Sequence, residues 1–475
     1  MPVFHANPDH ASSERCTRAL ERLRKRLDAV QARESGGEDF ERLERDIHAL
    51  FLEAEREVVG AELERLDADV PFVAVDGRRH HRVLEGPKTY MTAAGPVSVT
   101  RGLYRSGVQR AVVPVELRAG IVDGYWTPLA ARQASYLVAH VTPQEGESMF
   151  RELGNMTPSK SSLDRLPKAL SARWEAGREG HEAALREHLE VPEEAVSMAV
   201  SLDGVMVPMK DGGREAKRAE ARAAGRPTKG PAGYRKVGCA SVSFYDAEGE
   251  RLDTVRFARM PEAKKVALKA MLTAEVEAAL AKRPELTVVK VADGAVDNWT
   301  FLTALVPGGE ERVDFFHAAE QLKAALDAAY GDNDPTGRAQ YDKLRHVLRH
   351  DPDGAAKVIR ALAYQRNKHR RRKRIGEVLG YFRRHRQRMD YAPAAERHLP
   401  IGSGVVEATC KTLATQRLKR SGMRWRHAGG QAILTLRGLV QSKRFEQGWH
   451  RLSETYRAEV ALPDNVVALP RKRAA

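Results

Sequence analysis

Two apolar segments that each run into an Asp-Gly pair constrain the fold of this chain more than any other feature. Residues 196–202 lead into Asp203 and residues 287–292 lead into Asp293, and a glycine follows each acid. Short apolar runs rich in β-branched residues and bounded by turn residues are typical of buried strands. We therefore predict a sheet in which two strands each end at a carboxylate.

The segments around these strands predict the order of the sheet. Residues 234–244 and 251–259 form a hairpin around the turn 246–249, a helix follows at 262–282, and a last strand is expected at 312–316. Strands, then a helix, then a strand beside the first is the order expected of a ribonuclease-H-like sheet. Residues 214–236, rich in Ala, Gly and Arg, are expected to form a long mobile basic loop.

Beyond residue 316 the chain is expected to be helical for most of the distance to residue 391. It then turns at residues 400–404 and resumes a helix that carries Glu407. The predicted fold is therefore mixed α/β, with a ribonuclease-H-like core that a helical insertion interrupts.

Composition bounds the class of protein. The chain has 475 residues, of which 42% are hydrophobic, so it can bury a core; the prior from its length is roughly three domains. Its formal charge of +15 favours a polyanionic partner, although a basic surface also suits a membrane or solubility alone. No run of about eighteen apolar residues and no secretion signal is visible. Three scattered cysteines fit unremarkable thiols in a reducing cytoplasm.

The first 191 residues predict three modules. Residues 12–30 and 38–69 read as amphipathic helices, either a hairpin packed on its own domain or a dimerisation arm. Short strands are expected within 70–121, including one around Pro114, and helices return within 122–191. The helices 143–153 and 159–170, joined by a Gly-containing turn, make a helix-turn-helix candidate, although any small three-helix unit would look similar.

Basic residues gather in places that suit phosphate contact. Seven of the nine residues from 366 to 374 are Lys or Arg, which exceeds an ordinary solvated face. The second helix of the helix-turn-helix candidate and the segment after Glu407 are also basic. The predicted DNA contacts are Lys160, Arg165, Lys168, Arg370, Arg371, Arg372, Lys373, Arg374, Arg417, Lys419, Arg420, Arg424 and Arg426.

Three acids are the candidate catalytic residues. Carboxylates of Asp203 and Asp293 at neighbouring strand ends can share a cation, and Glu407 can complete an oxygen-rich set of the kind Mg²⁺ prefers. Such a set suits two-metal phosphodiester chemistry. Asp-Gly is also a common turn, and Glu407 also suits the positive start of a helix. Asp297 is either a helix cap or a residue that supports the three acids.

Five motifs carry a resemblance to a known family: SLDGVMVPM, KVADGAVDNWTFL, DFFHAAEQL, PIGSGVVEATCK and RLKRSGMRW. They resemble the ISKra-group bacterial insertion-sequence transposases, which are more distantly related to Mutator-like elements. The similarity runs from the helix-turn-helix candidate to about Lys443. It implies a ribonuclease-H-like transposase with the metal ligands Asp203, Asp293 and Glu407. Asp314 and His317 match an Asp-x-x-His element of the Mutator-like relatives, and we keep both as supporting candidates.

The resemblance also implies a reaction and partners. Two Mg²⁺ ions, replaceable by Mn²⁺, would support cleavage at transposon ends and attack of the freed 3′-hydroxyl on target DNA. Asp203 would bridge both ions. The partners would be double-stranded DNA, as terminal inverted repeats and target, and further copies of the chain, at least as a dimer. The place of action would be the bacterial cytoplasm and its nucleoid, with no membrane.

Two other readings stay open. The first is a ribonuclease-H-like nuclease or resolvase that cuts without joining, and the second is a DNA-binding regulator without metal chemistry. Trp299 or Trp425 could stack on an unpaired base, but a core position suits either residue.

The expected domain organisation follows from these segments. We predict a helical arm (1–69), a small β module (70–121), a helix-turn-helix region (122–191), a catalytic core (192–330 and 395–450), a basic helical insertion (331–394) and a C-terminal tail (451–475).

Overall fold

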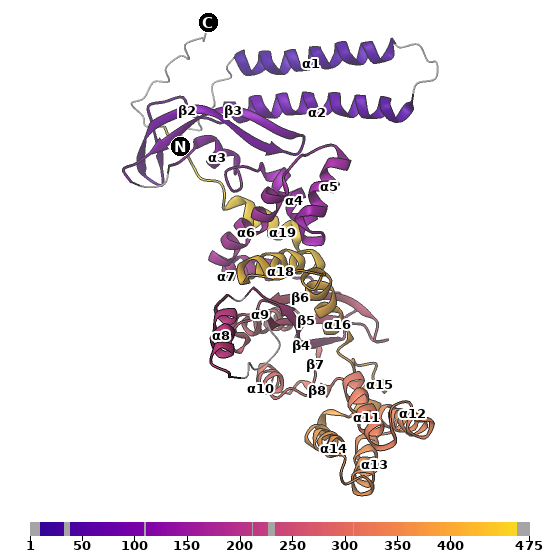
Figure 1. Ribbon diagram of the computed structural model, residues 1–475. Helices are drawn as coiled ribbons and strands as arrows, with labels where there is room; N and C mark the ends of the chain where they lie inside the picture. The colour runs from indigo at the N-terminus through magenta and orange to yellow at the C-terminus, as the bar shows by residue number, and fades with distance from the viewer. Residues whose placement is uncertain are drawn as a thin grey trace. The chain divides into compact units, whose positions relative to one another are not determined.

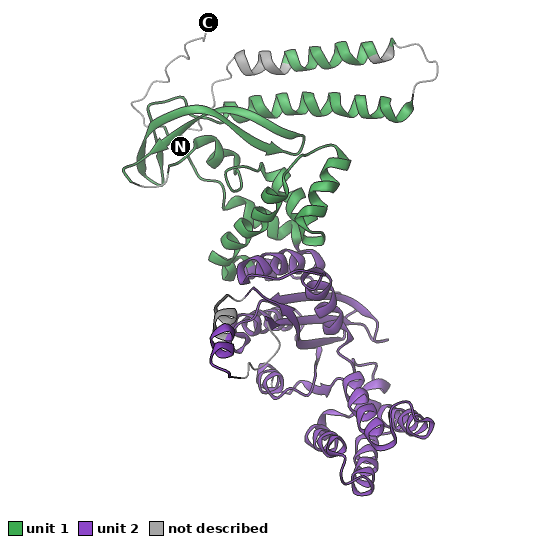
Figure 2. Cartoon of the chain, in the orientation of Figure 1, with its two compact units in different colours: residues 1–181, 445–475 green, residues 182–444 purple. Residues whose placement is uncertain are grey.

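The computed structural model describes residues 10–32, 39–108, 111–210, 212–226, 233–306 and 308–462. The fold is mixed α/β, as predicted, and the chain forms two compact units, 1–181 with 445–475 and 182–444 (Figure 2). The second unit contains all three candidate acids. It ends at Arg444, whereas the predicted catalytic core extends to residue 450.

The first unit begins with the predicted helical hairpin. Ion pairs of Arg22 with Glu57 and of Arg26 with Glu53 join the two helices. Asp39 caps the second helix, because its carboxylate accepts the backbone N–H of Glu41. The helices are α1 (His10–Gln31) and α2 (Phe40–Arg65).

A three-stranded antiparallel sheet follows, in the order β1-β2-β3. The first turn is Asp76-Gly77, and both residues have positive φ, which suits a two-residue hairpin. The strands are β1 (Phe72–Val75), β2 (Arg78–Thr92) and β3 (Gly95–Arg105). The prediction of a strand around Pro114 is wrong, because Pro114 occupies the first turn of helix α3 (Pro114–Ala119), where proline costs no hydrogen bond.

Helices complete the first unit. The helix α5 has the predicted bounds, with a capping box between Thr142 and Glu145 and an αL glycine, Gly154, at its end. The next helix, α6, begins after the cap Ser159 and runs beyond the predicted residue 170. The helices are α4 (Pro128–His140), α5 (Pro143–Leu153), α6 (Lys160–Ala176), α7 (Arg178–Glu187), which contains the boundary between the units, and α19 (Phe445–Glu454).

The second unit is built on a five-stranded mixed sheet with the order β6-β5-β4-β7-β8. The pairs β6-β5 and β5-β4 are antiparallel, whereas β4-β7 and β7-β8 are parallel. The strands are β4 (Ser197–Pro208), β5 (Tyr234–Tyr245), β6 (Arg251–Arg259), β7 (Thr287–Ala292) and β8 (Glu310–Val313). The predicted strand positions are therefore close to those observed, except at the end of β4 and at β8.

The prediction that the first strand ends at Asp203 is wrong. Strand β4 continues to Pro208, because β5 pairs with it along that whole length and places Cys239 opposite Asp203. Strand β7, on the other side, pairs with β4 only as far as Ser201. Asp203 therefore lies inside β4 but beyond the end of its parallel neighbour, and Asp293 follows that neighbour directly.

Helices cover both faces of this sheet (Figure 1). Because side chains alternate along a strand, Leu202 enters the core formed with α9 (Val266–Lys282), and Val207 enters the core on the opposite face. Asp203 shares the parity of Val207, so it points towards that opposite face. The elements there are α16 (Gly404–Thr409), the π-helical segment η3 (Cys410–Thr415), α17 (Gln416–Leu418) and α18 (His427–Gln441).

Two further predictions of local structure are corrected. The expected strand 312–316 ends at Val313, since Asp314 caps the helix that begins at Phe315. The basic segment after β4 contains the helix α8 (Gly212–Ala223), and residues 227–232 lie outside the described part. The predicted helix 262–282 begins at Val266, after the short 3₁₀ turn η1 (Ala263–Lys265).

A helical block lies between β8 and α16, where the insertion 331–394 was predicted, but it begins earlier, at Phe315. It contains α11 (Phe315–Tyr330), α12 (Pro335–His350), α13 (Gly354–Lys368), α14 (Lys373–His385), the 3₁₀ turn η2 (Arg386–Arg388) and α15 (Tyr391–Glu396). Across the described helices of the whole chain, none combines the length and the apolar character needed to cross a membrane.

We predict that Gly204→Ala destabilises the second unit. An added Cβ would lie 2.5 Å from the carbonyl oxygen of Val237, so β4 and β5 would have to separate beside Asp203. Such overpacking costs about 1–3 kcal/mol. The control is Gly380→Ala in α14, where no atom lies within 4 Å of the added Cβ. Because alanine favours a helix over glycine, this variant should raise the free energy of unfolding by about 0.5–1 kcal/mol. Urea titrations that rank the two variants equally would contradict this reading.

Candidate active site

Asp203 faces the helix that carries Glu407. Its Oδ2 accepts a long hydrogen bond from the Cys410 thiol at 3.9 Å, and Cys410 lies one turn after Glu407. On its other side, Oδ1 lies 3.7 Å from Nζ of Lys236, a residue of β5. The first candidate acid is therefore in contact with a cation and with η3, the segment that directly follows the helix of the third acid.

Glu407 lies in the first turn of the short helix α16, and the π-helical segment η3 begins three residues later, at Cys410. Residue Glu407 is exposed, yet its pKa is raised, first by partial burial of the carboxyl group and then by the charges of Asp314, Glu320 and Asp203. His317 acts in the opposite direction. Glu407 therefore lies within electrostatic reach of several other acids, and π-helical segments are frequent at functional sites.

Asp293 lies directly after β7, as predicted, and a network of hydrogen bonds fixes it. Its Oδ1 accepts the backbone N–H of Ala295 at 3.1 Å and Nδ2 of Asn298 at 3.0 Å. The same Nδ2 donates to the carbonyl oxygen of Leu202 at 3.2 Å. Because Asn298 is 1% exposed and Leu202 precedes Asp203, this one amide links the two aspartate positions.

Asn298, and not Asp297, makes this link. Asp297 is an exposed residue in the first turn of α10 (Val296–Leu305), and the capping position of that helix belongs to Ala295. The expectation that Asp297 caps the helix is therefore wrong. Its helical position turns it to solvent, while the next residue turns inward.

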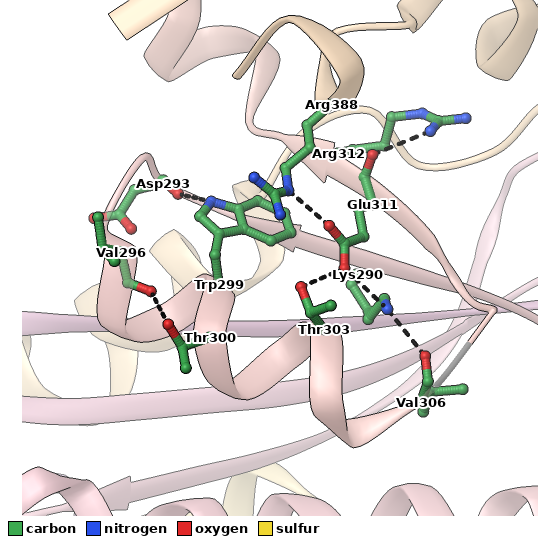
Figure 3. A network of polar contacts seen from close by, with 10 residues as sticks. All are labelled: Lys290, Asp293, Val296, Trp299, Thr300, Thr303, Val306, Glu311, Arg312 and Arg388. Atoms are coloured by element: carbon green, nitrogen blue, oxygen red, sulfur yellow. Dashed lines mark hydrogen bonds and ion pairs between the residues drawn. The ribbon is translucent and has the colours of Figure 1, made fainter. Parts of the chain in front are cut away.

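An ion network around the buried Lys290 lies beside Asp293 (Figure 3). Lys290 of β7, which is 1% exposed, lies 3.2 Å from Oε1 of Glu311, and Nε of Arg388 donates to the other carboxylate oxygen at 2.6 Å. The guanidinium of Arg388 lies over the ring of Trp299, 4.5 Å from its centroid, and Trp299 Nε1 donates to the carbonyl oxygen of Asp293 at 2.7 Å. Trp299 is thus a buried core residue.

Lys236 and Lys265 lie near Asp203 and Asp293, where strand β7 ends beside β4; we call this place the acidic edge of the sheet. Lys265 Nζ donates to Asn298 Oδ1 at 2.9 Å. Burial and the neighbouring Lys236 lower the pKa of Lys265, while the charges of Asp293 and Asp203 oppose that shift. Lys265 therefore lies within electrostatic reach of both aspartates.

Asp314 is a buried residue that joins distant segments. Its Oδ1 accepts the backbone N–H of His317 at 2.7 Å, which caps α11, and its Oδ2 accepts the backbone N–H of Ser403. Its own N–H donates to the carbonyl oxygen of Ala292 at 2.9 Å. His317 is partly exposed and pairs weakly with Glu320 at 3.7 Å.

The helical insertion also reaches Asp293. The ring of Tyr381, in α14, packs so closely on Gly294 that an added Cβ would lie 2.2 Å from it. Burial raises the pKa of Tyr381, and the charges of Asp293 and Asp314 raise it further. Burial, Arg388 and Arg384 lower the pKa of the neighbouring His385 to about 4. His385 is therefore neutral at pH 7.

Most of the predicted DNA contacts lie at the surface. Of these predicted contacts, the exposed ones in the first unit are Lys160, Arg165 and Lys168. Those in the second unit are Arg370, Arg371, Arg372, Lys373, Arg374, Lys419, Arg420, Arg424 and Arg426. Arg417 does not belong with them, since it is 2% exposed and its guanidinium lies 5.3 Å from the ring centroid of Trp425. Arg417 is a core residue, and its predicted DNA contact is inconsistent with this burial.

The donor set fits Mg²⁺ in its chemistry. Burial raises the pKa of Glu407 most, the charges of Asp314, Glu320 and Asp203 raise it further, and hard oxygen ligands are those that Mg²⁺ prefers. However, no three His, Cys, Asp or Glu side chains of the described ranges form a group ready to hold an ion. Lys236 and Lys265 compensate the acids instead.

Comparison with known proteins adds no family to this site. No family model matches the chain, and no curated protein matches it significantly. The assignment of function therefore depends on the geometry above.

Several residues of the site were missed from the sequence. The sequence could have predicted Asn298, because an amide on the inner face of a helix that follows a strand-end acid can reach back to that acid. No pattern in the sequence indicated Lys236, Lys265, Tyr381 and His385, since the fold alone brings them to the two aspartates.

We predict that Glu311→Gln destabilises the second unit by about 3–5 kcal/mol, because it leaves the buried charge of Lys290 uncompensated. Burial opposes the charged form of Glu311, but hydrogen bonds from Thr303, Arg388 and Lys290 outweigh burial and lower its pKa. This stabilisation is present above the ordinary pKa of 4.5 and is lost as the pH falls through the lower folded value. Urea titrations at pH 7 and pH 3.5 should show a smaller effect at the lower pH, and exposed Glu396→Gln is the control.

We predict that Asp314→Ala costs about 3 kcal/mol, because one carboxylate satisfies both the start of α11 and the backbone of Ser403. The matched control is Asp334→Ala, which removes only the cap of α12 and should cost about 1 kcal/mol. Equal free energies of unfolding for the two variants would show that the Ser403 contact contributes nothing.

Proposed function

We propose that this protein is a DNA transposase that binds the terminal inverted repeats of an insertion sequence and catalyses metal-dependent DNA cleavage and strand transfer. Asp203, Asp293 and Glu407 are its catalytic acids.

One observation carries the proposal. Asp203 lies within electrostatic reach of Glu407, and both Asp203 and Asp293 lie within reach of Lys265. Separations of 90 residues (293 minus 203) and 114 residues (407 minus 293) make this grouping a product of the fold. Carboxylates that lie near one another repel, so a place where they gather favours a cation beside them.

The arrangement of the second unit supports the same reading. Its sheet has the strand order and directions expected of a ribonuclease-H-like core, and a helical block separates the second acid from the third. The exposed run Arg370 to Arg374 lies on that block and provides charge for phosphate contact. In the first unit, α5 and α6 are the helix-turn-helix candidate for reading the repeats.

Each part of the site has a role in this proposal. Bound Mg²⁺ would activate the attacking oxygen and stabilise the leaving oxygen of the phosphodiester. The amide of Asn298 holds Asp293 in a fixed direction, and the Ser403 contact of Asp314 holds the turn before Glu407. Exposed Lys and Arg side chains bind the DNA backbone and orient the strands.

The test uses labelled DNA from either side of the coding region, a target plasmid and Mg²⁺. We expect end cleavage and joined products from the wild-type protein. Glu407→Gln should reduce cleavage by at least a hundredfold and leave DNA affinity nearly unchanged. Glu320→Gln is the matched control, because it removes a negative charge that also acts on Glu407 but should leave cutting intact.

Each result has a defined meaning. Cleavage without any joined product would indicate a nuclease or resolvase. DNA binding without cleavage would indicate a regulator. Undiminished cutting by Glu407→Gln would remove Glu407 from the site.

A further inference from the structure

Two successive lysines before α9 have left-handed backbones. Lys264 has φ 53° and Lys265 has φ 55°, a region that side-chain-bearing residues rarely adopt. The side chain of Lys264 is exposed, whereas Lys265 is partly buried. Strained residues persist where surrounding contacts hold them, and they cluster at functional sites.

The contact that holds Lys265 is a buried one. Its ammonium group donates to Asn298 Oδ1 at 2.9 Å, and Asn298 Nδ2 donates to Asp293 Oδ1 at 3.0 Å. An asparagine amide has one acceptor end and one donor end, so a lysine at the first end turns the second towards the carboxylate. Lys265 is thus joined to Asp293 through one fully buried amide.

The charges of both aspartates act on the same ammonium group. Burial and Lys236 lower the pKa of Lys265, the charges of Asp293 and Asp203 oppose that shift, and Lys236 itself lies 3.7 Å from Asp203. Positive charge near neighbouring carboxylates offsets their mutual repulsion. In the protein alone, lysines provide that charge.

We propose that Lys265 is the resident cation of the acidic edge: it offsets the repulsion between Asp203 and Asp293, and a divalent cation must act against its charge. The part of this inference that concerns the divalent cation rests on the proposed function, because that function makes the two aspartates metal ligands. Lys265 therefore sets how much Mg²⁺ the site requires. The charge matters more than the shape of the side chain, so arginine can replace it and methionine cannot.

The test measures thermal unfolding of the full chain, first with a chelator and then in a titration with MgCl₂. Lys265→Met should lower the metal-free Tm by about 2–4 °C, the shift that a modest destabilisation gives a unit of this size. It should also lower the half-saturating Mg²⁺ concentration by about threefold to tenfold. Lys265→Arg should keep that concentration within twofold of wild type, and Lys264→Met, at the exposed neighbour with the same backbone, should change neither value.

Unchanged or weaker Mg²⁺ binding by Lys265→Met would overturn the competition with a divalent cation, as would equal effects of the methionine variants at 264 and 265. Loss of the wild-type response by Lys265→Arg would overturn the role of charge.

A double-variant cycle separates this inference from the proposed function. In chelator, Lys265→Met should lower the Tm in the wild-type background and have little effect in an Asp293→Asn background, because the repulsion is then absent. Equal effects in the two backgrounds would overturn the resident-cation role. A wild-type Tm that does not respond to Mg²⁺ would instead count against the proposed function and leave the cycle to decide the role of Lys265.

Discussion

The buried carboxylate of Asp314 is the constraint on which the second unit depends. It accepts backbone hydrogens from His317 and from Ser403, two residues on opposite sides of the helical insertion. The backbone of Phe315 adds a hydrogen bond to the carbonyl oxygen of Ile401 at 3.0 Å. Because these bonds close the insertion at its base, the chain leaves β8 and returns at nearly the same point. The helix α16 can then pack on β4 and β5, which brings Glu407 to the face that Asp203 occupies.

Charge compensation explains why acids can gather at this edge of the sheet. Lys236 pairs with Asp203, Lys265 reaches Asp293 through Asn298, and the network of Lys290, Glu311 and Arg388 supports the strand that ends at Asp293. The two kinds of cation differ in exposure. Lys290 is sealed in the interior and has a structural role, whereas Lys236 and Lys265 keep contact with solvent and can respond to an incoming charge. The site thus has an interior cation, Lys290, that stabilises the fold and two outer cations, Lys236 and Lys265, that lie near the aspartates.

Local patterns predicted the elements well and the contacts less well. The sequence placed β7 and Asp293, the hairpin of β5 and β6, and helix α5, because alternation, turn residues and capping pairs act over a few residues. It misplaced the end of β4, since the length of that strand depends on pairing with β5 and not on Gly204. The basic patterns did not show that Arg417 is buried against Trp425, because burial depends on which helix covers the sheet. The three acids were grouped from their places at two strand ends and a helix start, and a resemblance added the same set, but neither gave the contacts of Lys236 and Asn298 with the two aspartates.

The helical insertion is a part of the candidate site and not an appendage to it. Its base is closed by Asp314, and its fourth helix returns to the sheet, where the ring of Tyr381 occupies the space that a side chain at position 294 would need. A glycine after Asp293 is therefore required by packing against the insertion. His385, on the same helix, lies beside Tyr381 with a ring separation of 4.9 Å and is kept neutral by burial and two arginines. A neutral ring adds no positive charge beside Asp293, so the compensation of that acid is left to Lys265, which reaches it through Asn298.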